Sequence, residues 1–558
     1  MSSIATRVWA QQQLAYFPHT DVSGDSWQFV KKGICTSSGA AGGTTLIDTN
    51  GDSGVVNSYD IGTYAGKWVH IISGAQQGEW KRIITDSGAG TLTFEDNGFS
   101  GQIVSGVSYE IWTSPEPVVV VQSSSGATDC VDARRTDEVD DFWKNYWMIP
   151  ITGSRRGEKA QITGSTQSTG TFVLGSGLSG ALTAGDVCLL RKFIEPEGLA
   201  VNVTESYDPR PMARVNFSRG DGIVGVRGGT VAFSLQATPS GSLSATGSKA
   251  GASIAAHLLE AGGLGETIGT SMTVGAGSTT TAVTVTTGTG ERCTAGMMVL
   301  WNGNATWVES VTDGGAGVDT VNVSPALPVA PAASDVLYAT RMYAKSTTGN
   351  VRAVGFEWEV NGIRTTVTGC KGNVQVQDGP IVKLNFSFQV DHYTREIEAT
   401  PYNAASAYVT AAPVRTADRV AYLDSTRYDI GGFTASPNTK VAARQVQGNY
   451  GINGRAGFQV TDYDAGGSFR SLSSVATDTL PQELRWSVRT AKKISVAFGG
   501  AGSTLGVRAQ VAQLVAVPAP ANAGGVVDVP EVWQAQDAGT ATTNLTTTKF
   551  PDFTICLT

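Results

Sequence analysis

A strictly alternating stretch decides the fold: residues 382–391 read VKLNFSFQVD. Valine, leucine and phenylalanine occupy every second position and polar residues lie between them, which is typical of a β-strand with one buried face. The pattern returns in residues 231–235 (VAFSL), 356–360 (FEWEV) and 484–488 (LRWSV). Burying one five-residue apolar face contributes roughly 8–10 kcal/mol before the entropy cost. The sequence therefore predicts a mainly β protein built on half-buried sheets.

One helix is expected among these strands, at residues 253–261. Ile254, Leu258 and Ala261 recur at helical spacing and form an apolar face. Two glycines, Gly262 and Gly263, follow directly, and glycine is common just after a helix C-terminus. We therefore expect a sheet core with one short helix packed on it.

Internal repetition is the most informative feature of the N-terminal third. Between residues 44 and 112 the chain contains the strand-like segments KWVHII (67–72), WKRII (80–84), GTLTF (90–94) and YEIW (109–112). A similar series follows between about residues 126 and 193: YWMI (146–149), KAQI (159–162), TFVL (171–174) and VCLL (187–190). Trp68 and Gly78 are ten residues apart, as are Trp147 and Gly157. We interpret the two series as copies of one small β-module.

A third, more degenerate copy is expected between residues 270 and 343. It contains GMMVLW (296–301), WVESV (307–311), VDTVNV (318–323) and DVLY (335–338). Chance similarity among strands rich in glycine and threonine is the alternative for this copy. Each module spans about 70 residues, which is enough for a small β-barrel or roll of four or five short strands.

These features divide the chain into eight parts. They are an N-terminal segment (1–43), module 1 (44–115), module 2 (122–194), a first core part (195–269), the inserted module 3 (270–343), a second core part (344–400), a further sheet unit (414–520) and a C-terminal extension (521–558).

Composition limits the class of protein. Hydrophobic residues make up 41% of the chain and charged residues 16%, against roughly 25% charged in an average soluble domain. This composition excludes a charge-driven disordered chain, and the 68 glycines are typical of many turns between short strands. No run of about 18 apolar residues predicts a membrane span. The first residues lack the basic start and apolar run of a secretory signal, so we expect a soluble protein used without export.

The charge pattern argues against a protein that grips nucleic acid. The 40 basic and 48 acidic residues give a net charge of −8. Nucleic-acid binding normally needs a basic stripe, because neutralising phosphates supplies the affinity. Here the basic pairs are isolated, at residues 31–32, 134–135, 155–156 and 492–493. An acidic surface is better suited to letting DNA pass than to holding it.

No metal site or cofactor is expected. The six cysteines are scattered with no C-x-x-C pair, and the four histidines are equally dispersed, whereas zinc ligands cluster at short spacing. Cys188 and Cys370 lie in apolar or strand-like surroundings, which favours buried thiols. A disulfide between distant cysteines remains the alternative.

No catalytic constellation is convincing, so no enzyme is predicted. Asp221, Asp462 and Asp464 offer carboxylates that could in principle hydrolyse a glycan, but aspartate in such turns usually bonds its own backbone. There is no convincing G-x-S-x-G elbow, and the glycine run at 498–502 is typical of a hairpin loop. Several aromatic residues could bind sugars, although small β-modules need such residues for their cores: Trp9, Tyr16, Phe17, Trp27, Trp80 and Trp143.

Three segments resemble the tail tube proteins of siphophages. Residues 229–264 resemble that family's opening strand, loop and short helix. The stretch TGCKGNV (368–374), followed by the alternating strand at 382–390, is similar to its next strand pair. The stretch GRAGFQVTDYD (454–464) with GSF (467–469) resembles a strand and turn of a second tube-like unit. The resemblance covers about half of the chain. It excludes the segment before residue 194 and the insertion at 270–343, which resemble add-on modules of phage structural proteins.

The resemblance implies a tail-tube-like β-sandwich or barrel core with three small inserted modules. It implies a virion tail protein, assembled in the cytoplasm of a host bacterium, whose inner sheets join those of its neighbours around a lumen for DNA. Two tandem units in one chain favour a trimeric ring with pseudo-hexameric symmetry, and a hexamer is the alternative. The implied partners are sister chains, the tape measure protein, the tail terminator and the baseplate or distal tail proteins. Viral DNA would pass without specific binding, and no membrane is involved.

The polar faces of the alternating strands are the candidates for the lumen. They contain Glu357, Glu359, Lys383 and Asp391. Ordinary solvent-facing residues are the alternative for each of them. Two other functions stay open: another tail, baseplate or decoration protein, and a glycan-binding adhesin on the tail surface.

Overall fold

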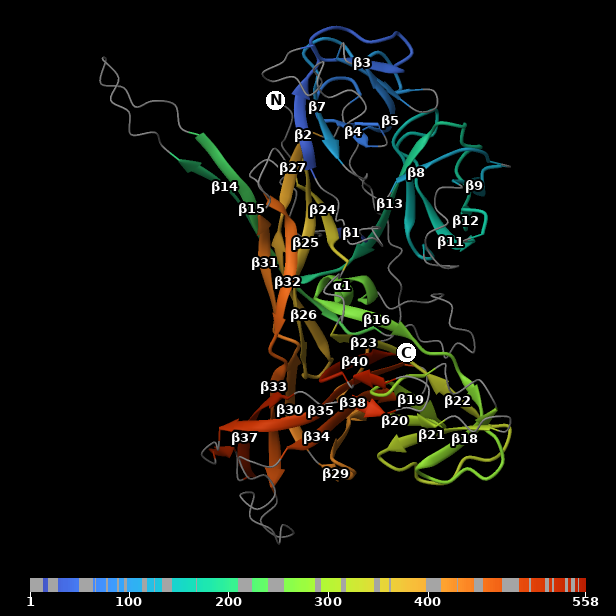
Figure 1. The fold of residues 1–558 in the computed structure, drawn as a ribbon, viewed down its shortest axis with the longest axis vertical. Helices are drawn as coiled ribbons and strands as arrows, with labels where there is room; N and C mark the ends of the chain where they lie inside the picture. The colour runs from blue at the N-terminus through green and yellow to red at the C-terminus, as the bar shows by residue number, and fades with distance from the viewer. Residues whose placement is uncertain are drawn as a thin grey trace, which may run out of the picture.

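The computed structural model describes most of the chain. The described residues are 14–18, 29–49, 64–65, 67–76, 79–87, 90–94, 98–112, 118–124, 126–132, 143–166, 168–208, 223–238, 255–286, 293–312, 318–345, 352–360, 363–397, 413–428, 430–445, 455–473, 491–500, 503–516, 521–523, 526–536, 540–542, 547–549 and 551–558. The protein is mainly β, as predicted, with antiparallel sheets arranged as three small modules beside a long core (Figure 1). Within the described residues, no helix is both long and apolar enough to cross a membrane.

Six strands of each module lie in the described residues. Those of module 1 are β2 (Phe29–Ile34), β3 (Thr45–Ile47), β4 (Trp68–Ile71), β5 (Trp80–Ser87), β6 (Thr91–Phe94) and β7 (Ser108–Trp112). Those of module 2 are β8 (Val118–Val120), β9 (Asp129–Val131), β10 (Trp147–Pro150), β11 (Ala160–Thr166), β12 (Thr171–Leu174) and β13 (Val187–Ile194). Those of module 3 are β17 (Met272–Thr273), β18 (Ala282–Thr286), β19 (Met298–Trp301), β20 (Asn304–Thr312), β21 (Val318–Ser324) and β22 (Val336–Ala339).

The three modules share one strand order. Modules 1 and 3 run β2-β7-β4-β5-β6-β3 and β17-β22-β19-β20-β21-β18. Module 2 runs β8-β13-β10-β11-β12-β9. If the strands are numbered one to six within each module, their order across the sheet is always 1-6-3-4-5-2. Each module also has its own apolar core. Such agreement over six strands supports the interpretation that all three, including the degenerate third, are copies of one unit.

The modules also pack through equivalent positions. Trp68 of module 1 and Trp147 of module 2 both begin the third strand of their module, and both pack against an apolar cluster on the outer face of module 2. Lys81 of module 1 reaches across and donates to the carbonyl of Gly185, 2.8 Å away. In module 3 the third strand begins at Met298, the residue equivalent to these two tryptophans. Met298 faces the core instead, where its backbone N–H points at Cys556 Sγ at 3.4 Å.

The core contains two sheet units. The first is formed by β14 (Glu197–Asp208), β15 (Ile223–Gln236), β24 (Val354–Val360), β25 (Ile363–Gln377), β26 (Lys383–Val390) and β27 (His392–Ile397). The second is formed by β30 (Ile430–Ser436), β33 (Gly466–Ser473), β34 (Lys492–Gly500), β35 (Ser503–Ala516), β37 (Val526–Ala535) and β40 (Phe553–Leu557). The ribbon of β31 (Thr439–Gln445) and β32 (Arg455–Tyr463) continues β30 and β33 into a longer hairpin.

The second sheet unit repeats the pairings of the first in the same chain order. β14–β15, β15–β26 and β26–β25 correspond to β30–β33, β33–β37 and β37–β35. The long strands β25 and β35 also pair alike. β25 forms a hairpin with β24, as β35 does with β34. The first half of β25 pairs with β27, as the first half of β35 does with β40. The core is therefore a tandem repeat of one sheet plan.

The alternation that predicted the core is confirmed in β26. Its apolar residues are all buried: Val382 (just before the strand), Leu384, Phe386, Phe388 and Val390. Phe233 of β15 and Phe356 of β24 pack on this buried face. The ring centroids of Phe233 and Phe356 are 5.5 Å apart. Residues 484–488, the other alternating segment, lie outside the described residues.

The predicted helix is present as α1 (Ala256–Ala261), and its earlier residues 253–254 lie outside the described part. All six of its residues are buried, so the helix has no solvent face. Gly263 follows with φ of +98°, a left-handed conformation that glycine adopts without strain.

Several predicted boundaries differ from the observed elements. β1 (Leu14–Pro18) lies in the expected N-terminal segment but pairs with β13 of module 2 and with β24 of the core. β2 lies in the same segment but is the first strand of module 1. β37 and β40 lie in the expected C-terminal extension but complete the second sheet unit. Short strands rich in glycine and threonine carry too weak a periodic signal to reveal a partner far away in the chain.

The remaining strands extend the core sheets, except for the last two, which form a two-stranded sheet of their own. They are β16 (Leu264–Ile268), β23 (Arg341–Lys345), β28 (Val420–Leu423), β29 (Thr426–Tyr428), β36 (Ala521–Ala523), β38 (Thr540–Thr542) and β39 (Thr547–Lys549). β16 and β23 pair with each other, and β23 also pairs with β40. These two strands lead into and out of module 3, which is therefore held to the core at both ends.

Candidate assembly edges and a pocket in the core

The two sheet units are joined edge to edge inside the chain. At this β25–β30 junction, Val376 lies opposite Ala435 and Gln377 opposite Thr434. The N–H of Asp378 donates to the carbonyl of Phe433 at 2.8 Å. The second half of β25 thus has β26 on one side and the end of β30 on the other.

The strand equivalent to β30 in the first unit, β14, has an open edge. Within the described residues it pairs only with β15. Its apolar residues Leu199, Val201 and Val203 pack toward the core, whereas Ala200 is exposed. In Figure 1 the β14–β15 hairpin projects beyond the rest of the core. An unpaired edge of this kind offers a row of backbone N–H and C=O groups to another strand.

The strand equivalent to β25 in the second unit, β35, has the matching open edge. Its last residues, 514–516, pair with β37 on one side and with no other strand in the described part of the chain. Val515 is 58% exposed and Val532 of β37 is 45% exposed. One border of the core is therefore the edge of β14, which is equivalent to β30. The other border is the edge of β35, which is equivalent to β25. Strands of these two kinds pair with each other at the β25–β30 junction.

The predicted lumen residues fall into three situations. Glu357 is only 3% exposed and accepts from Arg191, with Nη2 2.9 Å from Oε2, so its expected place on an open polar face is wrong. Lys383 pairs with Glu197 at 2.5 Å, and both side chains are partly exposed. Asp391 is half-buried beside Gly369, and the side chain of Glu359 lies outside the described residues.

A buried ion cluster explains the position of Glu357. Arg191 of β13 is 1% exposed, and Arg364 of β25 places Nε 3.6 Å from the other oxygen of Glu357. β1 lies between β13 and β24 and pairs with both. Glu357 belongs to the polar face of its strand, and β1 joins that strand to β13 in one sheet, so Arg191 and Arg364 lie beside Glu357 on the same face. No periodicity in the sequence could have revealed these neighbours.

Lys192, next to Arg191, is also buried at this junction, with Nζ 5.4 Å from the ring centre of Tyr146. Burial and the nearby Arg341 lower the pKa of Lys192 to about 7. Burying the charged lysine therefore lowers the free energy of unfolding by its full amount below pH 7. This destabilisation decreases as pH rises and disappears near the ordinary lysine pKa of about 10.4.

We expect Lys192→Met to stabilise the protein by on the order of 1–3 kcal/mol at pH 6, because methionine fills similar space without a charge. The difference from the wild type should shrink between pH 7 and 9. Urea unfolding at several pH values measures this, and Lys383→Met, at a partly exposed site, is the matched control. An advantage that stays constant with pH would contradict the assignment.

The carboxylates and aromatic residues considered for catalysis or sugar binding are used otherwise. Asp462 is exposed and pairs with Lys440 at 3.1 Å, and hydrogen bonds from Lys440 and the Tyr463 N–H lower its pKa. Asp464 accepts from Gln534. Trp80 and Trp143 are each 2% exposed, so neither offers a surface to a sugar. Asp221, Trp9 and Trp27 lie outside the described residues, as do the side chains of Tyr16 and Phe17.

All six cysteines are free and buried, in agreement with the expected state of Cys188 and Cys370. Burial raises the pKa of Cys35, Cys130 and Cys293 to about 12, so these thiols stay protonated near neutral pH. Among the described residues, no three His, Cys, Asp or Glu side chains are grouped as metal ligands.

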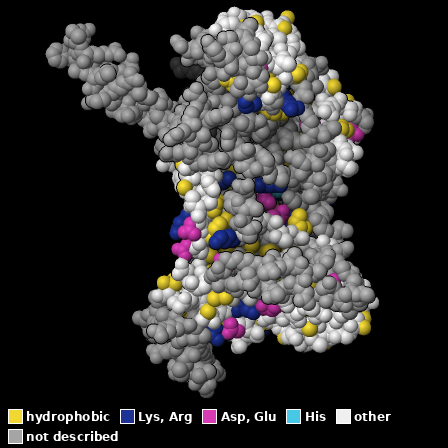
Figure 2. Space-filling view, in the orientation of Figure 1, with side chains coloured by type: hydrophobic (Ala, Val, Ile, Leu, Met, Phe, Trp, Pro, Cys, Tyr) yellow, Lys and Arg dark blue, Asp and Glu magenta, His cyan; other side chains and the backbone are white. Residues whose placement is uncertain are grey.

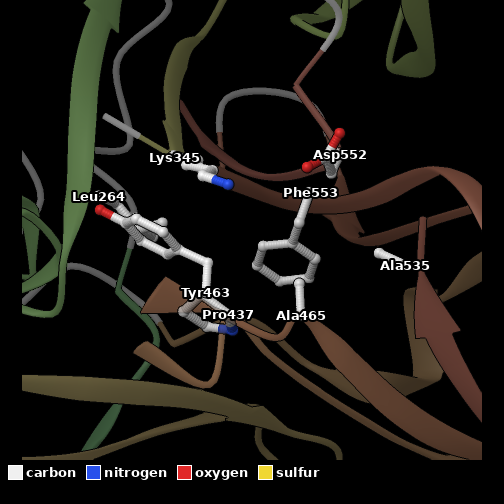
Figure 3. Close-up of a pocket in the computed structure, with 8 residues that line it drawn as sticks. All are labelled: Leu264, Lys345, Pro437, Tyr463, Ala465, Ala535, Asp552 and Phe553. Carbon is white, nitrogen blue, oxygen red and sulfur yellow. The ribbon is translucent and has the colours of Figure 1, made fainter. Parts of the chain in front are cut away.

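One small pocket lies where β16, β23, β32 and β40 meet (Figure 3). Its empty volume, including the open mouth, is about 330 Å³. Phe553 and Tyr463 form its walls, and Lys345 and Asp552 point toward it from the rim (Figure 3). Lys345 Nζ lies 5.2 Å from the Tyr463 ring centre, and Tyr463 donates to the carbonyl of Gly263.

Charged side chains of the described residues occur in small groups on the face that Figure 2 shows. Figure 2 shows no broad area of one sign over the described part of this face. This distribution agrees with the isolated basic pairs of the sequence. A search of protein-family models and of curated proteins finds no match to the chain.

Proposed function

We propose that the chain is the major tail tube subunit of a tailed bacteriophage, a structural protein that closes with sister chains into rings around a channel for DNA. One observation carries the proposal. The chain joins two equivalent sheet units through the β25–β30 junction, and in the part of the chain that the structure describes the edges equivalent to those two strands are open at its borders. A second copy can add to either border by the same pairing.

The repeat favours three chains per ring. Three chains supply six sheet units, and six copies of the chain per ring would supply twelve. Continuous pairing between chains would leave the ring without sheet edges, which removes the aggregation hazard of β14.

The position of the modules supports an outer location for them. In Figure 1 all three lie on one side of the core, away from the side on which the β14–β15 hairpin projects. Modules on the lumen side would block a channel. The net charge of −8 and the absence of a basic stripe suit a wall that DNA passes without being held. The proposed setting is the virion tail, with the tape measure, terminator and distal tail proteins as partners.

Electron microscopy of the purified protein tests the proposal. We expect hollow cylinders built from stacked rings, with three chains per ring. Six chains per ring would overturn the stoichiometry but leave the tube intact. A protein that stays monomeric at high concentration, with no hollow assembly, would overturn the function. Within a virion, the chain should be among the most abundant proteins.

A further inference from the structure

Module 3 docks on the second sheet unit by matching alternate residues of β20 and β35. A methyl group at Gly506 would lie 3.5 Å from Cζ2 of Trp307, so the indole covers this glycine. Two residues further along each strand, Glu309 Oε1 accepts from Arg508 Nη2 at 2.6 Å. Trp307 and Arg508 are 0% and 1% exposed, so these two side chains are shielded from solvent, whereas Glu309 and Lys493 are partly exposed.

The charges at this interface do not balance. Glu309 also accepts from Lys493 Nζ at 2.5 Å and from Gln510 Nε2 at 3.3 Å. Burial raises the pKa of Glu309, but the positive charges of Arg508 and Lys493 outweigh burial and lower this pKa below its ordinary value. The carboxylate is therefore ionised at neutral pH. One carboxylate therefore faces two cations, which leaves a net charge of +1.

Several hydrogen-bond donors at the same interface have no acceptor. They are Nε and Nη1 of Arg508, Nε1 of Trp307 and Oγ of Ser495. Ser495 is 0% exposed and lies opposite Arg508 in the β34–β35 register, so both side chains lie on the same face. Gln510 Oε1 is the one neighbouring acceptor that is also unpaired among the described residues. Leaving a buried donor unpaired destabilises the fold, so this many on one face is unusual.

We infer that a small monovalent anion of the halide class, such as chloride, binds between module 3 and β34–β35. Arg508, Trp307 and Ser495 donate to it. Water would satisfy the donors less well, because each water brings two hydrogens of its own and the face offers few acceptors for them. A halide brings no hydrogens, accepts from several directions and neutralises the net charge. The inference does not depend on the proposed function.

The binding ties the docking of module 3 to the anion, because the site is formed by residues of both parts. Unfolding should therefore respond to chloride by mass action. We expect the wild type to melt about 2–4 °C higher in sodium chloride than in sodium gluconate at equal ionic strength.

Two variants and one control identify the site. Trp307→Phe with Ser495→Ala removes two neutral donors and keeps the charges, and it should abolish the difference between the two salts. Trp533→Phe is the matched control, since Trp533 is 1% exposed and its Nε1 is equally unpaired, but it lies on β37. This control should keep the full response to chloride.

A crystal of the wild-type protein grown in bromide gives a readout that needs no variant. We expect one anomalous peak among Arg508, Trp307 and Ser495. Equal melting in the two salts, or ordered waters in place of the bromide peak, would overturn the inference. So would a double variant that responds to chloride as the wild type does.

Discussion

A chain that folds but no longer assembles is the expected result of placing proline on the outward edge of β14. Successive N–H groups of an antiparallel strand point to opposite sides. Of Ala200→Pro and Val201→Pro, one therefore removes an N–H that bonds β15 and the other an N–H on the open edge. Proline is tolerated on an edge strand but blocks the addition of a further strand.

The two proline variants should behave in opposite ways. The outward one should unfold like the wild-type monomer and lose assembly at least tenfold. The inward one should lose roughly 1–3 kcal/mol of stability, because it removes a hydrogen bond of the β14–β15 ladder. Sedimentation velocity and chemical unfolding measure the two properties separately. If both variants assembled as the wild type does, β14 would not be an assembly edge.

Paired cysteines distinguish the internal junction from the one between copies. Gln377 and Thr434 are direct partners at the β25–β30 junction, so Gln377→Cys with Thr434→Cys should cross-link within a single chain on oxidation. Ala200 and Ala516 lie on the equivalent open edges, and cysteines there should link one copy to the next and give a ladder of multimers. A cross-link confined to one chain in the second variant would show that these edges do not join copies. The six native cysteines are buried and should contribute little.

The largest loss of stability is expected from Glu357→Gln. Glu357 is the carboxylate that both Arg191 and Arg364 approach, and all three residues are less than 9% exposed. Removing its charge takes the carboxylate away from two buried guanidinium groups, and breaking a buried ion pair on one side typically costs about 3–5 kcal/mol. Guanidinium-chloride unfolding of the monomer measures the change.

A second variant separates the loss of charge balance from the loss of packing. Glu357→Met combined with Arg191→Met removes the strongest pair together and should recover much of the stability, since well-packed apolar residues often replace a buried ion pair at little cost. Lys383→Met, which removes the partly exposed partner of Glu197, should change stability by less than about 1 kcal/mol. An equally large loss in all three variants would mean that packing, not charge, governs this junction.

Strands whose exposure is set locally were predictable from the sequence. The alternation in residues 382–391 identified the buried face of β26, because a strand side chain points to one face or the other by position alone. The repeated tryptophan–glycine spacing identified modules 1 and 2 for a similar reason: each module buries its own core, so its pattern is complete within about 70 residues. The short helix was predicted by its apolar spacing and the glycines after it.

Only the tertiary structure decided which residues lie on shared faces. Glu357 sits on the polar side of an alternating strand, yet β1 joins that strand to β13 and so places Arg191 beside Glu357 in a buried ion cluster. The same holds for the donors around Arg508, which face module 3 across nearly 200 residues of chain. The edges of β14 and β35 also depend on which strands fail to find a partner. Sequence periodicity records whether a side chain points up or down from its own strand, whereas burial, charge balance and open edges depend on what the rest of the chain places against that strand.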